Sequence, residues 1–122
     1  MKVSEILIDA KSLVEKGWTQ GAFVRNKLGT DIKILDENFK LISPVDCSFC
    51  TIGAINFVLM KNFKLISDKS GECFSTFLTA NKIHYMTCWN DSPRRNQDQV
   101  VQAFENAINY ANELFMKDLS CD

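Results

Sequence analysis

SPVDCSFCTIGAINFVLM, residues 43–60, is the stretch that decides the fold of this chain. Its small and apolar residues are Phe49, Cys50, Ile52, Gly53, Ala54, Phe57 and Val58. Because they lie on nearly every face of a helix, this helix belongs in the centre of the domain, with its surface covered by other elements. Ser43, Pro44 and Asp46 resemble a capping start with proline in the first turn, so we expect the helix to begin there.

Three further helices are predicted from apolar residues at three- and four-residue spacing. The first covers residues 4–17, with Ser4 as its cap and Gly17 as its stop. Another covers residues 72–81. The last begins after Asn96, which forms a capping pair with Gln99. Its apolar face is formed by Val100, Phe104, Ala107, Ile108, Ala111, Leu114 and Phe115.

Residues 22–35 change to an alternating pattern around a turn at residues 27–30, which predicts a small β-hairpin. The predicted fold is therefore α+β, with about four helices packed around a central apolar helix. At 122 residues and 46% hydrophobic content, residues 1–122 are expected to form one domain. NFKLIS occurs at residues 38–43 and again at 62–67, and we interpret both copies as extended segments that lead into helices.

Composition limits the function. The chain has 14 basic and 15 acidic residues and a net charge of -1, so we do not expect nucleic-acid binding. It contains no apolar run of the roughly 18 to 20 residues that cross a bilayer, and no signal peptide, so we expect a cytoplasmic protein without a membrane partner. The five cysteines fit that compartment as reduced thiols.

Three motifs follow one another along the chain: KGWTQGAFVR at residues 16–25, C-x-x-GA at 50–54 and WND-x-P-x-R-x-Q-x-x-V at 89–100. In this order they resemble a small family from bacteria and their phages that is catalogued only as a domain of unknown function. The resemblance implies no established activity. The chain departs from the family pattern at Arg94 and Asn96, where glycine and threonine are expected.

CWNDSPRRNQDQV, residues 88–100, permits two interpretations. Asn96 and Gln99 explain it as a helix start. Alternatively, Arg94 or Arg95 joins the helix N-terminus to hold a carboxylate or phosphate. If the two tryptophan segments converge, the binding site for a ligand or partner would consist of Trp18, Gln20, Arg25, Trp89, Asn90, Asp91 and Arg95. A buried Arg25 needs an acidic partner, and we expect this partner to be Asp91.

The cysteines raise two alternatives. Cys47, Cys50, His84 and Cys88 have the residue types of a zinc site, but their spacing is not compact, so no metal and no cofactor are predicted. Cys50 as nucleophile, His84 as base and Asp91 or Asn90 as orienting group would make a cysteine-dependent hydrolase or transferase. The apolar neighbours of Cys50 instead favour an inert thiol.

The absence of a complete catalytic or metal motif favours a small binding or regulatory protein without enzymatic activity. Its ligand or protein partner is not identified by the sequence. The Cys50-dependent enzyme is the alternative. A second alternative, suggested by the phage members of the family, is an inhibitor of a host or defence protein.

Overall fold

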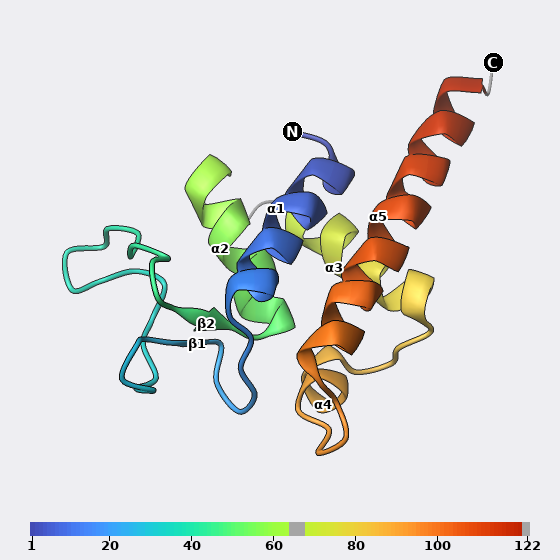
Figure 1. The fold of residues 1–122 in the computed structure, drawn as a ribbon. Helices are drawn as coiled ribbons and strands as arrows, with labels where there is room; N and C mark the ends of the chain where they lie inside the picture. The colour runs from blue at the N-terminus through green and yellow to red at the C-terminus, as the bar shows by residue number, and fades with distance from the viewer. Residues whose placement is uncertain (64–67, 121–122) are drawn as a thin grey trace.

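The computed structural model describes residues 1–63 and 68–120 (Figure 1). In chain order the elements are α1 (Val3–Lys16), β1 (Val24–Arg25), β2 (Ser48–Phe49), α2 (Thr51–Phe63), α3 (Asp68–Asn81), α4 (Met86–Asn90) and α5 (Gln97–Ser120). The strands β1 and β2 form one antiparallel pair. The α+β class predicted from the sequence is therefore confirmed.

The hydrophobic core lies between α1, α2, α3 and α5. Helix α1 packs against both α5 and α2, and α3 packs against α5 (Figure 1). The largest fully buried apolar side chains are Phe49, Phe77, Phe104, Ile6, Leu7, Ile55, Leu59, Val14, Val24 and Val100. The predicted central apolar helix is α2, in which Thr51, Gly53, Ala54, Ile55, Phe57, Val58 and Leu59 are all buried.

Helix α2 begins later than predicted. Ser48 and Phe49 are extended because they pair with Arg25 and Val24 of β1. On its other edge Phe49 pairs with the backbone beside Trp18, in a parallel bridge. Residues 48 and 49 thus lie between two other extended segments, β1 and the backbone at Trp18. Helix α2 can start only after them.

The hairpin expected at residues 22–35 is reduced to a tight turn. The Asn26 backbone N–H donates to the Thr30 carbonyl at 2.9 Å, and a single antiparallel bridge joins Arg25 to Asp31. The strand partner of β1 is β2, which is distant in sequence. Residues 26–46 run mainly as loops that extend away from the helices (Figure 1).

Other helix starts also differ from the predictions. Helix α1 begins at Val3, so Ser4 lies inside it, and the Glu5 carboxylate accepts the Lys2 backbone N–H at 2.9 Å. Helix α3 starts at Asp68 rather than at residue 72, and α4 was not predicted.

The start of α5 agrees with the prediction. The Gln99 backbone N–H donates to Asn96 Oδ1 at 2.9 Å, and the Asn96 backbone N–H donates to Gln99 Oε1 at 3.1 Å. The C-terminal turns of α5 project beyond the other helices, and Leu114 and Phe115 are each 40% exposed (Figure 1). The predicted apolar face of α5 is therefore only partly buried. Within the described residues, α5 and the other helices are too short or too polar to cross a membrane.

The two NFKLIS copies do not share a structure. Asn38 and Phe39 lie in a turn, whereas Asn62 and Phe63 form the last turn of α2. The expectation of two similar extended segments is wrong for these residues. The remainder of the second copy, residues 64–67, lies outside the described part of the chain.

Candidate functional site

The side chain of Asn90 joins three segments of the chain. It is 1% exposed. Its Oδ1 accepts hydrogen bonds from Trp18 Nε1 at 3.0 Å, from the Thr51 backbone N–H at 3.0 Å and from Thr51 Oγ1 at 2.8 Å. Its Nδ2 donates to the Thr19 carbonyl at 3.1 Å and to Asp91 Oδ1 at 2.9 Å. The two tryptophan segments therefore converge at the N-terminus of α2.

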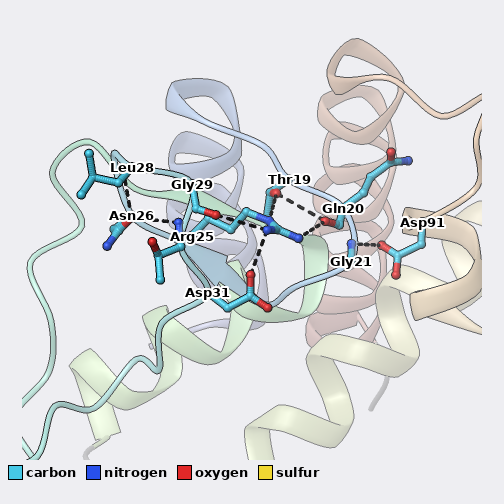
Figure 2. Close-up of polar contacts among 10 residues, drawn as sticks. Thr19, Gln20, Gly21, Arg25, Asn26, Leu28, Gly29, Asp31 and Asp91 are labelled. Carbon is cyan, nitrogen blue, oxygen red and sulfur yellow. Dashed lines mark hydrogen bonds and ion pairs between the residues drawn. The ribbon is translucent and has the colours of Figure 1, made fainter.

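Gln20 and Gly21 add a second set of contacts between these segments. Gln20 Nε2 donates to the carbonyls of Asn90 and Ser92 at 3.0 and 2.8 Å. The Gly21 backbone N–H donates to Asp91 Oδ1 at 3.0 Å (Figure 2). Gly21 has a φ of 75°, a left-handed conformation that glycine adopts without steric cost. The loop after α1 is thus fixed against the C-terminus of α4.

Arg25 does not pair with Asp91, and that expectation is wrong. Its Nη1 lies 2.9 Å from Asp31 Oδ1, across the turn that follows β1 (Figure 2). The other guanidinium contacts run to Thr19 Oγ1 at 3.0 Å, the Gln20 carbonyl at 3.1 Å and the Gly29 carbonyl at 3.3 Å. The Arg25 side chain is 32% exposed, so it remains in contact with water. Its acidic partner is the carboxylate of Asp31.

Trp89 and Arg95 form a separate pair. The Arg95 guanidinium lies 4.2 Å from the centroid of the Trp89 ring, and its Nε donates to the Trp89 carbonyl at 3.0 Å. The Trp89 ring packs edge-on against Phe77 of α3. This pair attaches α4 to α3. It does not line the cavity described next.

A cavity of about 310 Å³ lies beside the N-terminus of α2, and we call it the α2–α4 cavity. It is lined by Gly21, Ala22, Phe23, Val24, Asp31, Ile32, Cys50, Ile52, Thr87, Asn90 and Asp91. Of the predicted binding residues, only Asn90 and Asp91 line it. Trp18 and Gln20 do not line it, but both donate hydrogen bonds to Asn90.

Several lining residues were missed from the sequence, for identifiable reasons. Thr87 was overlooked because α4 was not predicted. Its carbonyl accepts the Asp91 backbone N–H at 2.9 Å, so the four-residue spacing within a helix would have placed it near Asp91. Asp31 could have been found as the residue opposite Arg25 across the hairpin turn.

Cys50 lines the cavity as the residue before the first turn of α2. Its side chain is buried, and its Sγ accepts the Gly53 backbone N–H at 3.3 Å. Burial raises the pKa of the Cys50 thiol, and the negative charge of Asp91 adds to this. The backbone N–H groups of Gly53 and Ile52 lower that pKa by less. The thiol is therefore protonated at neutral pH, in contrast to activated cysteines.

The structure does not assemble the sets proposed around Cys50. His84 is exposed, and no hydrogen bond within residues 1–63 and 68–120 joins it to Cys50. In the same residues, no group of three or more His, Cys, Asp or Glu side chains is close enough to hold a metal ion. The zinc alternative of Cys47, Cys50, His84 and Cys88 therefore has no geometric support.

Comparison with known proteins places the chain in a family. A family model described as "Family of unknown function (DUF6197)" matches residues 1–110. The chain belongs to the DUF6197 family. The match contains every residue that lines the α2–α4 cavity. No curated protein and no solved structure matches the chain.

Proposed function

We propose that this DUF6197 protein binds a small molecule in the α2–α4 cavity. The observation that carries the proposal is a cavity of about 310 Å³ with apolar walls and a polar rim held by hydrogen bonds. Small-molecule sites combine apolar walls with a few fixed polar groups, and their volumes start at about 300 Å³. The cavity of this protein matches that description at its lower size limit.

The rim is fixed before any ligand arrives. Asn90 uses both of its polar atoms for bonds inside the protein, and Asp91 is held by the Gly21 backbone and by Asn90. Groups fixed in this way lose little conformational entropy when a ligand binds. This preorganisation supports a binding role for the cavity.

The chemistry at Cys50 favours binding over a cysteine-dependent reaction. Burial raises the pKa of its thiol, while a nucleophilic cysteine needs a thiolate and a nearby base. The exposed His84 has no hydrogen bond to it among the described residues. We therefore assign Cys50 to the wall of the cavity and to the cap of α2.

A ligand screen tests the proposal. We expect some members of a library of small neutral, cationic and anionic compounds to bind the wild type in ligand-observed NMR. These compounds should not bind Thr87→Trp, in which the larger side chain occupies the cavity. The matched control is Thr79→Trp, an exposed position on α3 outside the cavity, and it should bind like the wild type.

The proposal fails if no compound binds in a way that depends on Thr87, that is, to the wild type and to Thr79→Trp but not to Thr87→Trp.

We also propose that the protein acts in the cytoplasm. Cys47, Cys50, Cys73 and Cys88 are free thiols in the structure. Free thiols persist in a reducing compartment. Their redox state in cells, measured by alkylation before lysis, tests this assignment, and extensive oxidation would contradict it.

A further inference from the structure

We infer that the ligand of the α2–α4 cavity is a small primary ammonium compound with an apolar body, bound through Asp91. This inference rests on the proposed function and names the chemical class of its ligand. It follows from three features of the cavity: the sign of its charged groups, one unused carboxylate oxygen and the apolar walls.

The charged residues that line the cavity are both acidic. They are Asp31 and Asp91, and no Lys, Arg or His side chain belongs to the described lining. The charge of Asp31 is balanced by Arg25, whose Nη1 lies 2.9 Å from it. Arg25 forms its other hydrogen bonds with Thr19, Gln20 and Gly29, and none of its contacts reaches Asp91. The cavity therefore retains one negative charge without a paired cation among the described residues.

The Asp91 carboxylate is fixed through one of its two oxygens. Oδ1 accepts the Gly21 backbone N–H at 3.0 Å and Asn90 Nδ2 at 2.9 Å. No donor in residues 1–63 or 68–120 contacts Oδ2. Oδ2 is thus an acceptor without a protein donor among these residues, on a side chain that lines the cavity. An ammonium group carries three N–H donors and a full positive charge, so it matches this acceptor.

The other walls favour an apolar body on the ligand. Val24, Ile32 and Ile52 line the cavity together with Ala22 and Phe23. Aliphatic and aromatic groups placed against such side chains are removed from water, which stabilises the complex. A polar, highly charged compound would leave these walls without favourable contacts. A ligand that carries an ammonium group on a hydrocarbon body would contact both Asp91 and the apolar walls of the cavity.

Three probes of matched shape test the ligand class. We would measure the affinities of 2-phenylethylammonium, 2-phenylethanol and 3-phenylpropanoate by isothermal titration calorimetry at neutral pH. We expect the wild type to bind the ammonium probe at least ~10-fold more tightly than the alcohol, and to bind the carboxylate most weakly. Added salt should weaken binding of the ammonium probe more than binding of the alcohol.

The Asp91→Asn variant then locates the effect. The amide that it introduces keeps an acceptor for Gly21 and Asn90, so the loop contacts can persist, but the charge is removed. We expect this variant to lose the preference for the ammonium probe while its affinity for the alcohol stays unchanged. The matched control is Asp36→Asn. Asp36 likewise accepts backbone N–H groups, from Asn38 and Lys40, but lies outside the cavity lining.

The outcomes separate this inference from the proposed function. If the wild type binds all three probes equally, or prefers the carboxylate, the ammonium assignment is overturned while the cavity remains a binding site. Failure of all three probes to bind also overturns the assignment. The proposed function is judged separately, by the library screen with Thr87→Trp. An ammonium preference that survives in Asp91→Asn would show that Asp91 is not the recognition group.

Discussion

At the scale of single residues, Asn90 determines how the two tryptophan segments meet. Its amide supplies both acceptor and donor groups in a buried position, and its neighbours Trp18 and Thr51 depend on it for hydrogen bonds. A buried donor that loses its partner costs about 1–3 kcal/mol, which is more than the hydrogen bond contributes when it is intact. Asn90 therefore has a structural role that its place in the WND motif does not by itself reveal.

Replacing Asn90 tests this role. Asn90→Ala should lower the free energy of unfolding by about 3 to 5 kcal/mol, because it leaves Trp18 Nε1 and Thr51 Oγ1 without their acceptor. Urea denaturation measures the change. Asn109→Ala, at an exposed position on α5, is the control and should change stability by less than ~0.5 kcal/mol. Equal effects of the two substitutions would contradict the assigned role of Asn90.

Cys73 gives the stability a defined pH dependence. Burial raises the pKa of its thiol from 9.0 to about 11. Below pH 9.0 the thiol is neutral in both the folded and the unfolded state, so its contribution is constant. Between pH 9.0 and about 11 only the unfolded chain releases the proton, so the free energy of unfolding should fall. The expected loss across this window is roughly 2 kcal/mol.

Urea denaturation under reducing conditions, repeated across this pH window, measures the loss. Cys73→Ala is less stable overall but has no thiol to ionise, so its free energy of unfolding should fall less steeply with pH. Parallel pH profiles of the wild type and the variant would rule out the contribution of Cys73.

Arg25 shows the limit of sequence reasoning at this scale. The sequence indicates that Arg25 needs an acidic partner, and the structure gives it one. The choice of Asp31 over Asp91 depends on a tight turn that brings Asp31 opposite Arg25. The motifs left open whether Trp18 and Gln20 converge with Asn90 and Asp91, and both the convergence and the identity of each hydrogen-bond partner required the fold.

At the scale of secondary-structure elements, the packing of α2 depends on a glycine. A Cβ placed on Gly53 would lie 2.1 Å from the Phe23 carbonyl oxygen, so the backbone after Gly21 can approach the helix only because no side chain intervenes. The same carbonyl accepts the Cys50 backbone N–H at 3.0 Å, which satisfies a donor at the start of α2. The close contact and the hydrogen bond hold the Phe23 backbone against α2, where Phe23 forms part of the wall of the α2–α4 cavity.

A pair of glycine substitutions separates this packing effect from helix propensity. Gly53→Ala should destabilise the protein by about 2 to 3 kcal/mol, because the Phe23 backbone must move. Gly71→Ala in α3 meets nothing within 4 Å and should stabilise it by about 0.5 to 1 kcal/mol. Thermal or urea denaturation of both variants gives the comparison. A stabilising effect of Gly53→Ala would show that the close approach is absent.

The start of α5 provides a further test. Asn96→Ala removes the side-chain acceptor for the Gln99 backbone N–H and should cost about 1 kcal/mol. It should leave ligand affinity unchanged, because Asn96 is exposed and does not line the cavity. Denaturation and calorimetry on the same preparation measure both quantities. An unchanged denaturation midpoint would contradict the capping role.

Helices were more predictable than strands in this chain, for a physical reason. The apolar spacing of α1, α2, α3 and α5 is a local property, so their existence could be predicted from the sequence. Strand β2 has only two residues, and its conformation is set by pairing with β1 and with the backbone beside Trp18. Short α4 has no apolar periodicity of its own. Such elements are determined by distant contacts that a local pattern does not contain.

At the scale of the whole molecule, the α2–α4 cavity is assembled from four separate segments of the chain. They are the loop after α1 with β1, residues 31–32, the start of α2, and α4. A larger hollow of about 740 Å³ lies between the N-terminus of α1, α3 and the last turns of α5. Its lining includes several charged side chains, among them Lys2, Glu5 and Glu72. We assign the ligand to the smaller cavity because Asn90 and Asp91 at its rim are held in place by hydrogen bonds.

The most direct test of this assignment is to map the binding site by NMR. Compounds that bind in the library screen would be titrated into ¹⁵N-labelled wild-type protein, and the amide chemical shifts would be followed. We expect the largest changes at Gly21, Val24, Ile52 and Asp91, and we expect these changes to be absent in Thr87→Trp. Changes centred on Lys2 and Phe115, at the larger hollow, or shifts that persist in Thr87→Trp, would contradict the assignment of the ligand to the α2–α4 cavity.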